Sequence, residues 1–129
     1  MTQTVLALET SCDETAVAVV QFHEGKFQIL ANCIASQADE HAQWGGVVPE
    51  IASRRHLEKM PFLLEKAIDQ SGISISKVNA IAATVTPGLT GALLVGSITD
   101  RTLACRHTVS YKHLRAHETL RDLVWRVVG

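Results

Sequence analysis

Apolar residues in the first part of the chain fall into short runs. Strand-forming residues occupy positions 4–8, 16–21 and 27–36. The intervening segments, 9–15 and 23–26, are polar or contain glycine. Short apolar runs separated by turn residues are typical of antiparallel strands. The pattern therefore predicts a three-stranded meander with a long first turn.

From Pro49 onward the apolar residues recur at steps of three and four, from Ile51 to Ile68, which predicts an amphipathic helix. Pro61 interrupts this pattern, because proline lacks a backbone N–H and clashes with the preceding turn. We therefore expect two helices or one sharp kink, with Gly72 closing the second segment. A buried strand over residues 78–85 and a small-residue helix over residues 92–104 follow.

The predicted order is β-β-β-α-α-β-α, an α/β fold. With 129 residues, 47% of them hydrophobic, the chain can bury the core of one domain. No apolar run approaches the roughly 20 residues of a membrane helix, so no membrane span is expected. The N-terminus resembles no secretion signal, and three cysteines lack CxxC spacing. These features predict a cytoplasmic protein with reduced thiols.

Charge is distributed unevenly along the chain. Residues 1–104 hold 7 Lys/Arg against 11 Asp/Glu, a balance of -4, whereas residues 105–129 hold 5 against 2, a balance of +3. The acidic first part shows no basic face for a nucleic acid.

The first turn carries the most chemistry. It combines the hydroxyls of Thr10 and Ser11 with the acids Asp13 and Glu14. Hydroxyls and backbone N–H groups in a turn can bind phosphate, and a nearby acid can position a metal, a water or an attacking amine. The alternative is a solvated hairpin tip stabilised by its own side chains. Nothing in the sequence marks Cys12 as an activated nucleophile, which favours a packing role.

Two glycine-containing segments introduce the helices. Residues 45–56 place Pro49 where it suits a first helical turn. Residues 87–96 end in Gly96, within the second helix, where another backbone or a ligand can approach closely. Free N–H groups at such helix starts can bind an anion. Ordinary helix initiation and close packing against the sheet are the alternative interpretations.

In this order and spacing, the segments 11–15, 45–56 and 87–96 resemble the TsaD family, formerly called the glycoprotease family, which makes the threonylcarbamoyl modification of tRNA. The resemblance covers residues 5–104. It implies a lobe like those of actin, sugar kinases and Hsp70, which are ribonuclease H-like and close in pairs around a nucleotide. We predict that residues 1–104 form the N-terminal lobe only.

The resemblance also implies an activity. The family transfers a threonylcarbamoyl group from its adenylate to N6 of adenosine 37, in tRNAs that read codons beginning with A. By analogy Asp13 and Glu14 are the catalytic residues, and Thr10 and Ser11 lie near the adenylate phosphate. Residues 49–70 would help to contact a TsaB-like paralogous subunit. A TsaE-like ATPase would be a further partner.

The family also binds one divalent metal, iron or zinc, through a His-x-x-x-His segment. His113 and His117 have the i, i+4 spacing that places both rings on one helix face. The pair lies closer to Gly96 than in the family, Arg115 stands where the family has an acid, and residues 106–108 replace an apolar strand. The third ligand would come from the other lobe, so we expect this chain not to bind the metal.

Residues 109–128 resemble translated vector or adaptor sequence. We therefore predict that residues 105–129 are a tail foreign to the family, of artefactual origin. Near-helical spacing of Leu114, Leu120, Val124 and Val127 does not decide its origin. Two other function classes remain open. A non-catalytic TsaB-like subunit would usually lack the acids of the first turn, and a sugar kinase-like phosphotransferase would lack residues 45–50.

Overall fold

The computed structural model describes residues 2–107 and 109–115 of the chain. Its elements, in order, are β1 (Thr2–Glu9), β2 (Glu14–His23), β3 (Lys26–Ser36), α1 (Ala38–Ala42), α2 (Pro49–Ser71), the 3-10 turn η1 (Ile75–Lys77), β4 (Ala80–Thr86), α3 (Thr90–His107) and β5 (Ser110–Arg115).

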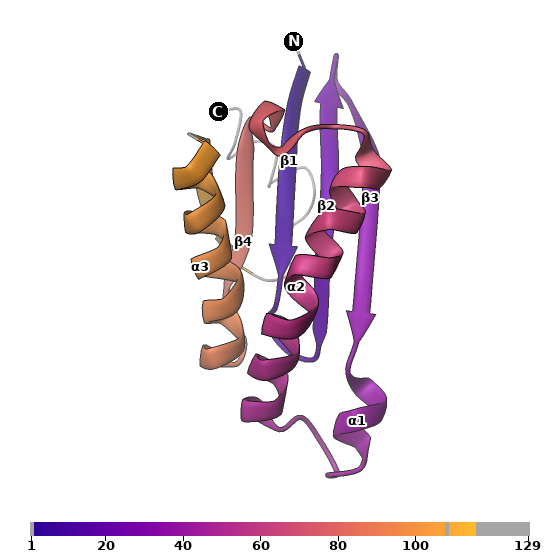
Figure 1. The fold of residues 1–129 in the computed structure, drawn as a ribbon, viewed down its shortest axis with the longest axis vertical. Coiled ribbons are helices and arrows are strands. Elements are labelled where there is room, and N and C mark those ends of the chain that lie inside the picture. Colours follow the sequence, from indigo (N-terminus) through magenta and orange to yellow (C-terminus); the bar gives the residue numbers. More distant parts are fainter. Residues whose placement is uncertain (1, 108, 116–129) are drawn as a thin grey trace.

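The strands form one mixed sheet in the order β3-β2-β1-β4-β5 (Figure 1). Strands β1, β2 and β3 pair antiparallel, which confirms the predicted meander. Strand β4 lies parallel to β1, with Val5 opposite Ala80, and β5 lies parallel to β4. The chain thus crosses over from β3 to the other side of β1 by way of α2. The carboxyl ends of β1 and β4 consequently meet at the same end of the sheet.

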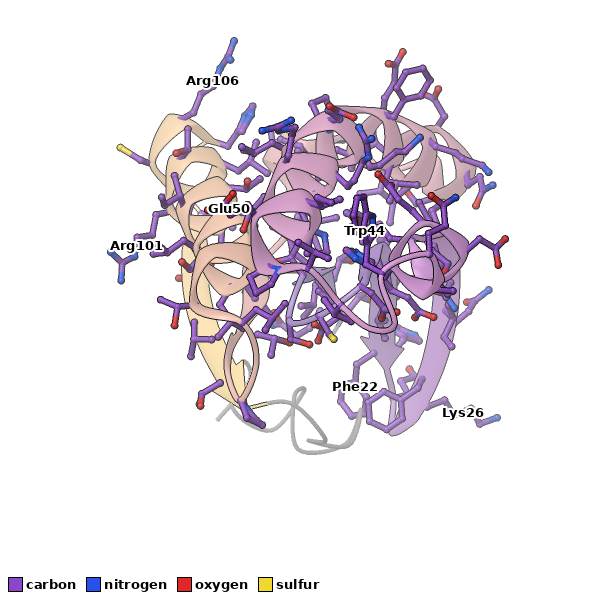
Figure 2. All side chains as sticks on the ribbon, turned by 90° about the horizontal axis from the view of Figure 1, so that it is seen from below. Phe22, Lys26, Trp44, Glu50, Arg101 and Arg106 are labelled. Atoms are coloured by element: carbon purple, nitrogen blue, oxygen red, sulfur yellow. The ribbon has the colours of Figure 1, made fainter. Side chains whose placement is uncertain are left out.

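Helices α2 and α3 lie side by side on one face of the sheet (Figure 2). Alternate strand residues point toward them, so the core collects pairs such as Leu6 and Leu8 or Val17 and Val19. Met60, Leu63 and Ala67 of α2 complete this core. Burying one large apolar side chain contributes about 1.5–3 kcal/mol, so this layer provides the main support for the fold.

Helix α2 runs without interruption from Pro49 to Ser71, so the alternative of two separate helices is wrong. Pro61 is exposed, and the carbonyl that it deprives of a donor belongs to Leu57, also on the exposed side. Water can satisfy that carbonyl, and the buried residues of the opposite face hold the helix together. Gly72 ends the helix with φ 69°, as predicted.

Three elements had not been predicted: α1, the short 3-10 turn η1 and β5. Helix α1 has only 5 residues, too few for a periodic signal. Strand β5 includes Tyr111 and His113, so the expectation that His113 lies on a helix face is wrong. Pairing with β4 decides the conformation there, because the open edge of β4 offers backbone hydrogen bonds that a helix would leave unused. His117 lies outside the described residues.

Cys12, Cys33 and Cys105 are free thiols, as the spacing predicted. Within residues 2–107 and 109–115, no helix combines the length and apolar character needed to cross a bilayer.

Candidate functional site

The turn between β1 and β2, residues 10–13, lies at the end of the sheet where β4 finishes and where α2 and α3 begin (Figure 1). In open α/β sheets, ligands bind at the carboxyl ends of the strands. A Cβ added to Gly91, near the start of α3, would lie 2.6 Å from the Ser53 hydroxyl of α2, so the two helix starts approach closely. We call residues 10–15, the turn with the start of β2, the acidic turn.

Thr10 anchors the acidic turn to α3. Its side chain is buried, with 1% exposed. The hydroxyl donates to the Ala92 carbonyl at 2.6 Å and accepts from the Gly96 N–H at 3.1 Å. These two groups would pair with each other in a regular helix, so Thr10 inserts into the helix ladder. The close approach predicted at Gly96 is confirmed: an added Cβ there would lie 2.8 Å from the Thr10 hydroxyl.

Ser11 is held through its backbone. Its N–H donates to Glu9 Oε1 at 2.5 Å, and its carbonyl accepts from the Leu89 N–H at 2.8 Å. The other Glu9 oxygen accepts from the Thr84 hydroxyl at 2.6 Å, which ties β1 to β4. Gly88 approaches the Ser11 carbonyl so closely that a Cβ would clash with it. Both backbone groups of Ser11 are thus occupied, and the residue is half-buried.

His56 connects α2 to the acidic turn, a role that its sequence context had not suggested. The ring is fully buried. Its Nε2 donates to the Cys12 carbonyl at 2.8 Å, and Nδ1 lies 2.7 Å from the hydroxyl of buried Thr15. Because a carbonyl only accepts, Nε2 carries the proton and Nδ1 accepts from Thr15. Burial lowers the pKa of His56, and the Cys12 carbonyl and nearby acids oppose this only in part, which favours the neutral ring.

A second buried histidine supports the same turn indirectly. The Asp13 carbonyl accepts from the Gln37 N–H at 2.8 Å. The buried Gln37 side chain accepts from His41 Nε2 at 2.7 Å, and its amide donates to the Ala52 carbonyl at 3.4 Å. His41 Nδ1 in turn accepts from the Val48 N–H at 3.0 Å. The acidic turn, α1 and the start of α2 are therefore joined by buried hydrogen bonds.

In the described part of the chain, the two acids of the turn do not take part in these buried hydrogen bonds through their carboxylates. Asp13 is half-buried and Glu14 is exposed. Within residues 2–107 and 109–115, no ion pair engages either carboxylate. Cys12 is also exposed, so the expected packing role for this thiol is wrong: its backbone carbonyl, and not its side chain, is what contacts α2. The turn thus contains two acids and three hydroxyl residues, of which Thr10 is already engaged with α3 and Thr15 with His56.

Two other charged groups lie away from the turn. Arg55 binds Glu40 of α1 and Glu58 of α2, each at 2.8 Å. The hydrogen bond from Arg55 holds the pKa of Glu40 below its usual range. In α3, burial raises the pKa of Asp100 to about 7, against the opposing effect of Arg101. Figure 2 shows Arg101 and Arg106 pointing away from the body of the protein.

A cavity of about 460 Å³ lies between the end of β4 and the first half of α3, next to Gly88. Its polar lining comes from Thr86, Thr90, Ser97 and Arg101. Hydroxyls and a guanidinium can bind an anionic or polar ligand. The end of the sheet therefore offers an open cavity lined by polar groups.

The residues expected to bind a metal are not brought together in the described part of the chain. His113 lies in β5 and His117 lies outside the described residues. Across residues 2–107 and 109–115, no group of three or more histidine, cysteine or acidic side chains could hold a metal ion. The described residues therefore do not fit a metal site.

Comparison with known structures identifies the fold. An uncharacterised protein from Pseudomonas aeruginosa with similarity to peptidase YeaZ superposes with a TM-score of 0.67 and 22% identity, covering 96% of this chain and 48% of that chain. RuvC of T. thermophilus superposes with a TM-score of 0.51 and 10% identity, covering 88% and 65%. Together with the strand order, these likenesses show an α/β ribonuclease H-like lobe, as predicted.

Comparison with sequences identifies the family. The model of the family TsaD, tRNA N6-adenosine threonylcarbamoyltransferase, matches residues 28–119 and so continues past the boundary predicted at residue 104. A transferase of that name from Prochlorococcus marinus is 69% identical over 118 residues, and one from a Synechococcus species is 60% identical over 116 residues. These alignments cover 89% and 88% of this chain but 33% of each relative, so the chain spans about a third of their length. The chain belongs to the TsaD family of tRNA N6-adenosine threonylcarbamoyltransferases.

Proposed function

We propose that this chain supplies the catalytic turn of a transferase that moves a threonylcarbamoyl group from threonylcarbamoyl-AMP to N6 of adenosine 37 in tRNA. The observation that carries the proposal is the acidic turn. It is anchored to α2 through the Cys12 carbonyl and to α3 through the Thr10 hydroxyl, and it leaves Asp13 half-buried and Glu14 exposed. Family membership supplies the reaction class.

In this reaction the N6 amine attacks the carbonyl carbon of a mixed carbamoyl phosphate anhydride. A nitrogen–carbon bond forms, the carbon–oxygen bond to AMP breaks, and the amine loses one proton. We assign Asp13 to orient the amine and accept that proton, with Glu14 as the second acid. Such a reaction needs positioning and charge stabilisation and no covalent enzyme intermediate.

The AMP phosphate that leaves is an anion. We assign its binding to the Ser11 hydroxyl and to the first turn of α3, whose N–H groups and helix dipole favour negative charge. The Thr10 hydroxyl already has two partners in α3, so within the proposed site Thr10 acts by fixing the position of Ser11.

A chimera tests this proposal. Residues 2–104 replace the matching segment of the Prochlorococcus marinus transferase, and the purified protein is incubated with threonylcarbamoyl-AMP, unmodified tRNA and that organism's partner proteins. We expect modified adenosine in the tRNA, detected by mass spectrometry of its nucleosides. The 129-residue chain assayed in the same way should give none, because the family's site lies between two lobes.

The same assay separates the other function classes. A sugar kinase-like phosphotransferase would instead consume ATP in the presence of a sugar, and a non-catalytic TsaB-like subunit would do neither. The acids of the turn argue against the TsaB-like class, and the family match argues against both.

We further propose that α2 and α3 bind a TsaB-like subunit through their outer apolar surface. Four large side chains are exposed there: Leu57 and Phe62 on α2, Leu94 and Ile98 on α3. Large apolar side chains left exposed on packed helices can mark an interaction surface. We propose a TsaE-like ATPase as a further partner. We also propose that the protein acts in the cytoplasm, where tRNA is modified.

Phe62→Glu tests the partner surface. Phe62 is 77% exposed, so the substitution should leave the stability of the chain nearly unchanged. Loss of a buried aromatic at an interface should weaken binding of the TsaB-like subunit by at least about 2 kcal/mol. Isothermal titration calorimetry measures this, and Glu65→Lys on the same helix serves as the charge control. Unchanged affinity for the Phe62→Glu variant would place the partner elsewhere.

The tail remains a separate proposal. We propose that residues 105–129 are foreign to the natural protein, although the family match reaches residue 119. Sequencing the source gene through codon 105 decides the matter, because a native reading frame that continues into these residues would refute the foreign origin.

A further inference from the structure

The acidic turn is held on its α2 side by hydrogen bonds from one buried ring. His56 contacts the residues on both sides of the Asp13–Glu14 pair: the Cys12 carbonyl at 2.8 Å and the Thr15 hydroxyl at 2.7 Å. It reaches them across 44 and 41 residues of sequence. Asp13 itself is held by its carbonyl, through Gln37. The backbone around the acid pair is thereby fixed to α2 and to the start of α1. The two carboxylates take no part in these three hydrogen bonds.

We propose that His56 is a positioning residue for Asp13, a role that deepens and rests on the proposed function. The ring sets the direction of the Asp13 carboxylate by fixing the Cys12 carbonyl and the Thr15 hydroxyl. It does not reach the substrate, because its ring is buried and both its nitrogens are occupied.

The geometry makes the role specific to this ring. Nε2 must donate and Nδ1 must accept, so only the neutral tautomer with the proton on Nε2 serves both partners. Burial lowers the pKa of His56, which favours the neutral ring, and the two partners select this tautomer. His56 also lies next to exposed Leu57 on α2, so the element that carries the proposed partner surface is the element that holds the acid pair.

Three substitutions separate the two contacts. His56→Gln keeps an N–H donor near the Nε2 position, and His56→Asn keeps an acceptor near the Nδ1 position. His56→Leu fills a similar volume and removes both bonds. Met60→Ala, in the core on the same helix and one turn further on, is the matched control, because Met60 packs in the hydrophobic core and not among the hydrogen-bond partners of the turn.

In the chimera, His56→Leu should lower kcat roughly 100-fold while KM for tRNA changes little, because a misplaced catalytic group affects the chemical step. His56→Gln should retain a large part of the kcat that is lost in His56→Leu. In an Asp13→Ala background the His56→Leu substitution should add almost nothing, since it acts through Asp13. Met60→Ala should lower the thermal unfolding temperature without this selective loss of kcat.

Each result bears on a different claim. If Asp13→Ala abolishes transfer but His56→Leu lowers kcat no more than Met60→Ala at equal destabilisation, the positioning role is refuted and the proposed function stands. If the chimera does not transfer at all, the proposed function fails. The positioning claim is then decided on the 129-residue chain by NMR. His56→Leu should shift the Asp13 and Glu14 amide resonances and speed their hydrogen exchange, and unchanged amides would overturn it.

Discussion

Asp13→Ala in the chimera should lower the rate of threonylcarbamoyl transfer roughly 100- to 10,000-fold, the range typical of losing a group that takes up a proton in the transition state. Stability should change far less, by about 1 kcal/mol or less. The reason is structural: the Asp13 backbone carbonyl accepts the hydrogen bond from the Gln37 N–H that holds Asp13 in place, and alanine retains that carbonyl. Single-turnover formation of modified adenosine measures the first effect and urea unfolding the second.

Asp39→Ala is the control for this prediction. Asp39 is an exposed acid in α1, two residues beyond Gln37, and its loss removes the same charge from the same end of the protein. Its transfer rate should match that of the unsubstituted chimera. A parallel loss of rate and stability in Asp13→Ala would instead assign Asp13 a structural role.

Among glycine-to-alanine substitutions near the site, Gly88→Ala should lower the stability of the protein most. Its Cβ would clash with the Ser11 carbonyl and lie 2.8 Å from the Ser11 Cβ. The clash involves backbone on both sides, which cannot rotate away as a flexible side chain can. We expect a loss of about 1–3 kcal/mol in the free energy of unfolding, the usual range for overpacking. Displacement of Ser11 should also lower the transfer rate by roughly 100-fold.

Gly46→Ala provides the matched comparison. A Cβ at Gly46 would meet no atom within 4 Å. Alanine there restricts the unfolded chain, so the protein should be unchanged or about 0.4–1 kcal/mol more stable. Urea unfolding of the three 129-residue proteins tests the pair. Equal stabilities for Gly88→Ala and Gly46→Ala would show that the close contact between Gly88 and Ser11 does not form.

The fold was largely predictable because its strongest signals are local. Short apolar runs separated by polar turns indicate β1 to β3, and a buried apolar run indicates β4. The failures have physical causes of two kinds. Helix α2 tolerates Pro61 because solvent can satisfy the carbonyl of Leu57, which a rule about isolated helices cannot anticipate. Strand β5 forms through pairing with the edge of β4, a contact between distant segments.

The site shows the same division. Its composition was predictable, since Thr10, Ser11, Asp13 and Glu14 are adjacent in the sequence. Their support was not, because it comes from residues more than 20 positions away, chiefly His56, Gln37 and Gly96. Burial of His56 depends on α2 packing across the sheet. The Thr10 hydroxyl is bonded to α3, and this role likewise could be predicted only once the position of α3 was known.

Under the proposed function, residues 2–104 carry a working acidic turn of the family. The most direct measurement is the single-turnover rate at which the chimera forms threonylcarbamoyladenosine in unmodified tRNA, compared with the parent Prochlorococcus marinus transferase. We expect the two rates to agree within about tenfold, a difference of about 1.4 kcal/mol in the barrier. A folded chimera that forms no modified adenosine, beside an active parent enzyme, would contradict the claim.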